Sequence, residues 1–105
     1  MQYSKNDILC FLQVLKPDLF AQGITSLGVF GSIVKETNTP ESDIDIVYET
    51  SDKFLEKYQG WSAFTYLNTH LRDKISEKFH THVDMFDLNS SSTIKDKIKK
   101  EAHYV

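Results

Sequence analysis

The sequence predicts an α/β fold in which a short mixed β-sheet is flanked by helices. Three apolar stretches of strand length lie at residues 27–30, 43–48 and 83–88, and the second alternates between polar and apolar side chains. Apolar stripes of helical spacing come before and between these stretches. The 105 residues, 40% of them hydrophobic and 26% charged, suit one globular domain with a modest core. We therefore expect residues 1–105 to form a single domain.

The first helix is expected to begin near Ser4. Ser4, with Asp7 three residues later, has the pattern of a helix N-cap. Pro17 cannot donate the next backbone hydrogen bond, so it predicts an interruption, followed by a second short turn that ends at Gly23. The apolar stripe of this helix comprises Ile8, Phe11, Leu12 and Leu15.

The centre of the chain is a predicted strand-loop-strand unit over residues 28–48. The first strand stops at Gly31 and Ser32, where a residue without a side chain lets a ligand approach the backbone closely. If a helix starts after Ser32, its free N–H groups and the serine hydroxyl can bind phosphate oxygens. Pro40 and its polar neighbours then predict a reversal of the chain.

The second strand of this unit carries two carboxylates on one face. Strand alternation places Asp43, Asp45 and Val47 on one side, with Ile44, Ile46 and Tyr48 on the other. Two neighbouring carboxylates repel each other unless a cation lies between them. Mg²⁺ takes one or two protein carboxylates together with substrate phosphates, so the unit indicates metal-assisted phosphoryl or nucleotidyl transfer.

The second half of the chain predicts two more helices and a third strand. Residues 49–60 are expected to form a connection without assigned structure. A helix is expected from Ser62 to about His80, the strand follows at 83–88, and a last helix covers 92–102 with Ile94 and Ile98 turned inward. The core stripe of the longer helix comprises Phe64, Leu67, Leu71, Ile75 and Phe79.

These residues resemble a known family. Gly31-Ser32, nine further residues and then Ser42-Asp43-Ile44-Asp45 are similar to the GS…SDxD signature of the DNA polymerase β-type nucleotidyltransferases, with the spacing of the minimal nucleotidyltransferase (MNT) subfamily. Residues 83–86 resemble the family's later strand, which bears a third carboxylate, and residues 98–102 resemble its closing helix. Members commonly have Arg-Gly where this sequence has Lys35-Glu36.

The resemblance implies a role for each site residue. Asp43, Asp45 and Asp84 are the implied catalytic and Mg²⁺-binding carboxylates, and Asp84 would be the general base. Asp87 competes for the third position, but strand alternation places Asp84 and Asp87 on opposite faces, so only one can join the pair. The implied residues for binding ATP as substrate are Gly31, Ser32, Lys35 and Ser42.

The resemblance also implies a biological role. MNT proteins of this size are typically antitoxins that accompany HEPN ribonuclease toxins, and members transfer AMP from ATP to a tyrosine of the toxin. We therefore expect a Mg²⁺-dependent protein adenylyltransferase in a hetero-complex with a HEPN toxin. One alternative is an antitoxin that neutralises the toxin by binding alone, which Lys35-Glu36 favours. Another is a transferase for a small hydroxylated molecule such as an aminoglycoside, and the lack of room for a substrate domain counts against it.

Composition and motifs argue against several other classes. The net charge of −3 disfavours direct nucleic-acid binding, which depends on basic surfaces. The longest apolar run near the start, residues 8–12, is too short for a signal peptide or a membrane span, so we expect a cytoplasmic protein. An EF-hand loop would need further oxygen ligands after Asp45, and Ser32 lacks the G-x-S-x-G pattern of a hydrolase nucleophile.

His80 and His82 raise the possibility of a zinc site. They precede Asp84 at a spacing of two, so an extended chain would place all three on one face. We interpret His80 as a residue at the end of a helix, a position that histidine tolerates, and His82 as a polar residue that flanks the site.

Overall fold

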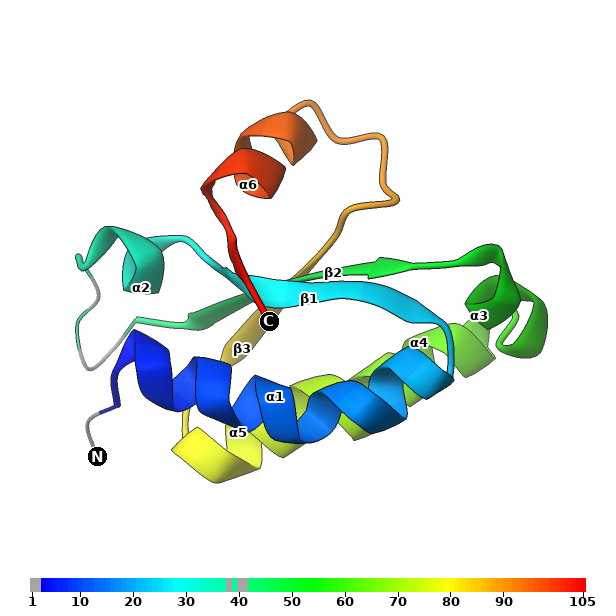
Figure 1. Ribbon diagram of the computed structural model, residues 1–105, viewed down its shortest axis with the longest axis horizontal. Helices are drawn as coiled ribbons and strands as arrows, with labels where there is room; N and C mark the ends of the chain where they lie inside the picture. The colour runs from blue at the N-terminus through cyan, green and yellow to red at the C-terminus, as the bar shows by residue number, and fades with distance from the viewer. Residues whose placement is uncertain (1–2, 38, 40–41) are drawn as a thin grey trace.

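The computed structural model is built on a mixed four-stranded β-sheet with the strand order β3-β2-β1-β4 (Figure 1). Its strands are β1 (Ile24–Phe30), β2 (Ile44–Thr50), β3 (Val83–Asp87) and β4 (His103–Tyr104). β1 is antiparallel to β2 and β4, whereas β2 and β3 are parallel. The predicted fold class is therefore confirmed. The structure describes residues 3–37, 39 and 42–105, so the turn predicted at Pro40 lies outside the described residues.

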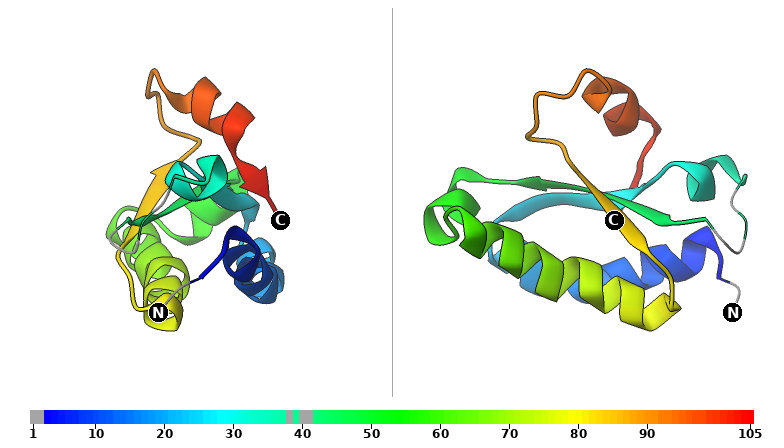
Figure 2. Two further views of the ribbon diagram at one scale, coloured as in Figure 1. Left: turned by 90° about the vertical axis from the view of Figure 1, so that its left-hand side faces the viewer. Right: turned by 180° about the vertical axis from the view of Figure 1, so that it is seen from behind.

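Two long helical segments cover one face of the sheet (Figure 2). The first is α1 (Lys5–Ala21), and Ser4 caps it as predicted, in a reciprocal pair of hydrogen bonds with Asp7. The second segment crosses the same face beside α1. It consists of α4 (Trp61–Leu67), a π-helical turn η1 (Asn68–Arg72) and α5 (Asp73–Phe79).

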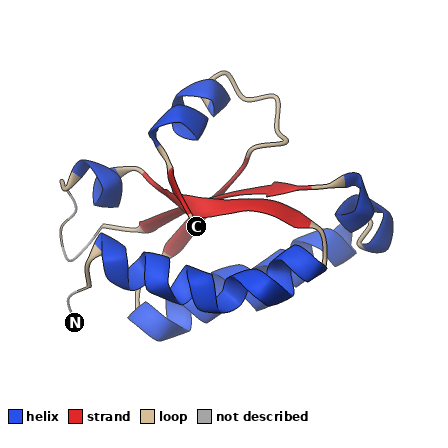
Figure 3. Ribbon diagram, in the orientation of Figure 1, coloured by secondary structure: helices blue, strands red, loops and turns tan. Residues whose placement is uncertain are grey.

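Three short helices complete the fold. α6 (Lys95–Glu101) lies on the opposite side of the sheet from the two long segments (Figure 3). α2 (Ser32–Lys35) follows β1 at the end of the sheet where β2 begins, and α3 (Asp52–Lys57) follows β2 at the other end. Among the described residues, no helix combines the length and the apolar character that crossing a membrane requires.

The two faces of β2 pack into two separate cores, as its alternation predicts. Ile44, Ile46 and Tyr48 belong to the main core between the sheet and the long helices. Val47 points the other way, into a small core under α6. β2 is therefore anchored on both faces, which fixes the register of the aspartates at its start. The small core consists of Val47, Leu88, Ile98 and Ala102.

The predicted break at Pro17 is wrong, because α1 continues through it to Ala21. A proline inside a helix costs about 3 kcal/mol through the lost hydrogen bond and a clash with the preceding turn. Here Leu12 and Leu19 are both buried, so the same helical stripe packs into the main core on both sides of Pro17. Pro17 itself is exposed, and this packing outweighs the local cost.

Two residues expected in the core are exposed. Phe64 has 56% of its surface accessible, because the wide π turn between α4 and α5 rotates α4 relative to the stripe that follows. Ile94 has 51% accessible, because it precedes the first turn of α6 and does not lie on the buried face of that helix.

Other element boundaries also differ from expectation. β1 begins at Ile24, and the connection after β2 contains α3. His80 has φ 53°, so the helix does end there as predicted. After the last helix, His103 lies on β4. The pairing of β4 with β1 brings the His103 backbone carbonyl into the space that a side chain on Gly28 would need.

Candidate active site

Three neighbouring strands align their ends at the candidate site. Phe30 on β1 is paired with Asp45 on β2, and Asp45 is paired with Asp84 on β3. Asp43 immediately precedes β2, two residues before Asp45, and therefore lies on the same face. Strand register thus brings together the three carboxylates that the sequence predicts.

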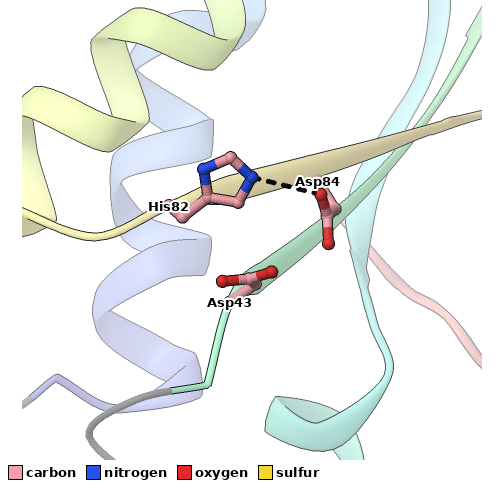
Figure 4. A group of neighbouring side chains, drawn as sticks. All are labelled: Asp43, His82 and Asp84. Carbon is pink, nitrogen blue, oxygen red and sulfur yellow. Dashed lines mark ion pairs between the residues drawn. The ribbon is translucent and has the colours of Figure 1, made fainter.

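Asp43 and Asp84 form a close cluster with His82 (Figure 4). One ligand atom from each residue lies within 4.8 Å of the other two, and His82 Nε2 is 3.5 Å from Asp84 Oδ1. The Ile44 N–H donates to the His82 carbonyl at 3.0 Å, which ties the residue before β3 to the start of β2. His82 is therefore a member of the cluster, and its spacing of two from Asp84 was the signal for it in the sequence.

Asp45 is half-buried, and its pKa is shifted. Partial burial, the nearby carboxylate of Asp84 and then that of Asp43 raise the pKa of Asp45 above its usual value. In the metal-free protein, ionisation of Asp45 is therefore less favourable than for an isolated aspartate. A cation among these groups would relieve that penalty.

The Gly31-Ser32 turn lies directly against Asp45. Gly31 has φ 76°, and a Cβ built on it would overlap the Asp45 carboxylate, so only glycine fits there. Ser32 then begins α2, in which Val34 N–H and Lys35 N–H both donate to the Gly31 carbonyl at 3.1 Å. The N–H groups at the very start of a helix have no partner within it, so those of Ser32 and Ile33 remain to meet a ligand.

Lys35 and Ser42 make contacts outside the carboxylate cluster. Lys35 Nζ is 3.8 Å from Glu101 Oε2, which links α2 to α6. The Ser42 hydroxyl accepts a hydrogen bond of 2.8 Å from Thr39 N–H, and its carbonyl accepts one from the Tyr3 hydroxyl at 3.5 Å. Ser42 therefore fixes the chain just before the aspartates.

Asp87 lies away from the cluster and contacts other groups. It is paired with Tyr48 in the strand register, and its Oδ1 accepts a hydrogen bond of 2.7 Å from Asn89 N–H. Burial, with the Asp87 carboxylate as a second cause, raises the pKa of Tyr48 to about 12. Among the described residues, the metal-ligand cluster consists of Asp43, His82 and Asp84. It does not include Asp45, which was predicted as a metal ligand, nor Asp87 or His80.

The donor set of this site fits a divalent cation. Carboxylate oxygens converge from Asp43 and Asp84, and Asp45 adds a third carboxylate that they influence electrostatically. Among the described residues, the basic group that pairs with a carboxylate of this cluster is His82, which contacts Asp84 and is charged only when protonated. Mg²⁺ with a bound nucleotide takes hard oxygen donors such as these carboxylates together with phosphate oxygens.

Comparisons with known proteins agree with this geometry. The family model described as polymerase beta, nucleotidyltransferase, matches residues 14–105. A solved structure of a minimal nucleotidyltransferase is similar over 97% of this chain and 96% of its own, with a TM-score of 0.70 and 13% identity. No curated protein matches this chain.

Two toxin-antitoxin structures are also similar. One, solved with AMP-PNP, has a TM-score of 0.62 and 23% identity. The other, a mutant of the toxin-antitoxin MntA-HpeT, has a TM-score of 0.61 and 21% identity. Each match covers 97% of this chain and 72% of the other chain. At these identities, the likeness shows a shared nucleotidyltransferase fold.

Proposed function

Because this chain belongs to the polymerase β nucleotidyltransferase family, we propose that it transfers AMP from ATP to a tyrosine of a HEPN-family toxin and thereby neutralises the toxin. The observation that carries this proposal is the convergence of Asp43, Asp45 and Asp84 beside the Gly31 turn. The cytoplasm supplies both ATP and Mg²⁺, so it is the proposed location.

The structural relatives support the choice of nucleotide and partner. One toxin-antitoxin relative was solved with AMP-PNP, an analogue of ATP. Another carries two aspartate-to-glutamate substitutions, two positions apart. Asp43 and Asp45 have that same spacing. These features favour a toxin as partner and ATP as donor for this chain.

Each residue of the proposed site has a separate role. Asp43, Asp45 and Asp84 would hold Mg²⁺, which neutralises phosphate charge when it is bound. The free N–H groups after Gly31 and the Ser32 hydroxyl would bind phosphate oxygens and orient the α-phosphorus. In the transfer, the tyrosine oxygen bonds to the α-phosphorus, the bond to the β-phosphate oxygen breaks, and pyrophosphate leaves. Asp84 would accept the phenol proton.

A second candidate function is neutralisation of the toxin by binding alone. The observation in its favour is the ion pair between Lys35 and Glu101. This pair holds the Lys35 ammonium group at α6, whereas it would otherwise bind the phosphates of ATP. Lys35 also lacks the planar, bidentate group of the arginine that is common at this position. Both features would weaken ATP binding and leave a protein surface available for the toxin.

Intact-mass measurement distinguishes the two candidates. The protein is incubated with ATP, Mg²⁺ and the protein encoded by the neighbouring gene, and both masses are recorded. AMP transfer adds the mass of an adenylyl group to the partner, and the addition disappears in EDTA or in the Asp43→Asn, Asp45→Asn double variant. A complex that co-elutes without any gain in mass would establish the binding-only alternative in place of our proposal.

A further inference from the structure

His82 belongs to the carboxylate cluster, but the proposed transfer assigns it no role. Its backbone is fixed, because its carbonyl accepts the hydrogen bond from Ile44 N–H where the pairing of β2 with β3 begins. Its side chain is 69% exposed, so the ring is not part of a core. The ring lies beside the carboxylates of Asp43 and Asp84 (Figure 4). A ring nitrogen of His82 therefore faces the same space as the carboxylate oxygens.

The distance between His82 and Asp84 suits two ligands of one ion better than a direct hydrogen bond. His82 Nε2 lies 3.5 Å from Asp84 Oδ1, whereas a hydrogen bond from nitrogen to oxygen is about 2.7–3.2 Å long. Two ligands of a tetrahedral Zn²⁺, each about 2.0–2.1 Å from the ion, are about 3.3–3.4 Å apart. Octahedral Mg²⁺, with bonds of similar length, places neighbouring ligands only about 2.9 Å apart. The observed spacing is therefore closer to that of zinc ligands.

The three side chains of the cluster form a ligand set that favours zinc over magnesium. Mg²⁺ takes oxygen ligands, whereas an imidazole nitrogen suits Zn²⁺. Catalytic zinc sites use three protein ligands, drawn from histidine and carboxylate side chains, and keep a further position open. Asp43, His82 and Asp84 supply this combination, and a ligand atom of Asp43 lies within 4.8 Å of the other two. In the part of the chain that the structure describes, His82 and not Asp45 is therefore the third member of the cluster.

We propose that Asp43, His82 and Asp84 form a binding site for Zn²⁺, in which the His82 imidazole is the ligand that discriminates against Mg²⁺. This inference rests on the proposed function, because it concerns the metal of the same site. The nucleotide-free protein binds Zn²⁺ in preference to Mg²⁺ through the one nitrogen ligand of the cluster. Binding of Mg²⁺ together with ATP depends instead on carboxylate and phosphate oxygens, so it does not require His82.

Titration calorimetry of the nucleotide-free protein at one neutral pH measures this preference. The parent should bind Zn²⁺ at least about tenfold more tightly than Mg²⁺. His82→Asn should weaken zinc binding by at least about tenfold, since loss of even an outer partner of a metal ligand costs about 10–100-fold in affinity. The affinity of the same variant for AMP-PNP with Mg²⁺ should not change. Equal affinities of the parent for the two ions, or unchanged zinc binding in His82→Asn, would overturn the proposal.

His80→Asn is the matched control for His82→Asn. It makes the same substitution two residues earlier, at an exposed histidine that is not a member of the cluster identified among the described residues. His80 has φ 53°, a conformation that asparagine also adopts, so the substitution adds no backbone strain. This variant should bind Zn²⁺ like the parent. Equal losses of zinc affinity in the two variants would mean that exposed histidines hold the ion without a defined site.

NMR of the imidazole nitrogens shows whether His82 itself binds the ion. Zn²⁺ should shift the Nε2 resonance of His82 in the parent and leave the ring nitrogens of His80 unshifted. The amide spectrum of His82→Asn checks that the variant is folded, which its exposed position favours. A zinc-bound parent in which the His82 nitrogens do not shift would contradict the assignment of this ligand.

The zinc site and the proposed function fail in different ways. If the parent protein transfers no AMP to its partner, the proposed function is wrong, and the zinc titration still decides whether His82 is a metal ligand. If the parent transfers AMP with Mg²⁺ but His82→Asn binds Zn²⁺ as tightly as the parent does, the function stands and the zinc site is wrong.

Discussion

The carboxylate of Asp45 occupies the space that a side chain on Gly31 would need. The glycine turn and the aspartate strand are therefore parts of one packed unit, although they are separated by the loop between β1 and β2. This contact places the N–H groups after Gly31 beside the carboxylates. The proposed site for phosphate and metal thus depends on the absence of one Cβ.

Gly31→Ala is expected to destabilise the protein and to abolish nucleotide binding. The new methyl group meets the Asp45 carboxylate, and the positive φ of Gly31 adds backbone strain. Gly60→Ala is the control, since Gly60 also has a positive φ but has open space around it. Urea unfolding should show that Gly31→Ala loses roughly 1–3 kcal/mol more than Gly60→Ala, because overpacking adds to the strain. Equal losses would mean that the contact with Asp45 has no energetic weight.

The double variant Asp43→Asn, Asp45→Asn separates a metal site from a structural role. The substitution removes two like charges but keeps the shape, so in EDTA it should melt at the same temperature as the parent or higher. Mg²⁺ with ATP should raise the melting temperature of the parent but not of the variant. If the aspartates serve instead as turn caps, the variant in EDTA should lose about 1–3 kcal/mol through unpaired groups, and the metal-site interpretation fails.

The raised pKa of Asp45 predicts how stability depends on pH in the metal-free protein. The folded state binds the Asp45 proton more tightly than the unfolded state, whose pKa is near 3.8. As pH falls from neutral through the folded pKa, Asp45 therefore adds stability, and the gain is complete below the unfolded pKa. In EDTA, the parent should gain unfolding free energy relative to Asp45→Asn as pH falls. A difference between the two proteins that stays constant with pH would argue against the shift.

Asp84→Asn should abolish AMP transfer, whereas Asp87→Asn should retain most of it. Asp84 is paired with Asp45 and lies within the cluster, so its loss removes both a proposed ligand and the proposed base, worth at least 10²–10⁴ in rate. Asp87 accepts a hydrogen bond from the Asn89 backbone, and the amide oxygen of asparagine can still accept it, so Asp87→Asn should cost less than about 1 kcal/mol of stability. Transfer rates and thermal melts of both variants check this. Equal losses of activity in two folded variants would refute the choice of Asp84.

The ion pair between Lys35 and Glu101 predicts opposite effects of two substitutions on ATP binding. Lys35→Ala should weaken binding of AMP-PNP with Mg²⁺, while Glu101→Gln should strengthen it by releasing the lysine for the phosphates. Both changes should alter stability by less than about 1 kcal/mol, because the pair is solvent-exposed. Isothermal titration calorimetry measures the affinities. Unchanged affinity in both variants would exclude Lys35 as a nucleotide ligand.

The sequence predicted the parts of the fold that depend on local pattern. The alternation of β2 separated Ile44 and Ile46 from Asp45 correctly, because both faces of that strand are packed against apolar layers. Strand alternation also distinguished Asp84 from Asp87, since a period of two leaves no other choice. Gly31 was predicted to let another group approach the backbone closely, and within the chain that group is the Asp45 carboxylate.

The sequence did not predict features that depend on tertiary packing. Pro17 remains within α1 because buried leucines on both sides compensate for it, and no local rule contains that information. The π turn η1 moved Phe64 out of the core, and the sequence stripe alone gives no sign of it. The ion pair of Lys35 joins two helices that are far apart in the chain, so it is visible only in the folded protein.

The small core under α6 gives the protein unequal rigidity on its two sides. Among the described residues, four buried side chains form the small core that holds α6 to the sheet, whereas sixteen form the main core on the other face. Since each buried aliphatic side chain contributes about 1.5–3 kcal/mol, opening α6 alone requires far less free energy than unfolding α1. Backbone amides of α6 should therefore exchange with deuterium before those of α1. Each such opening would also separate Glu101 from Lys35, so the electrostatic environment of the glycine turn would fluctuate at the frequency of this local motion.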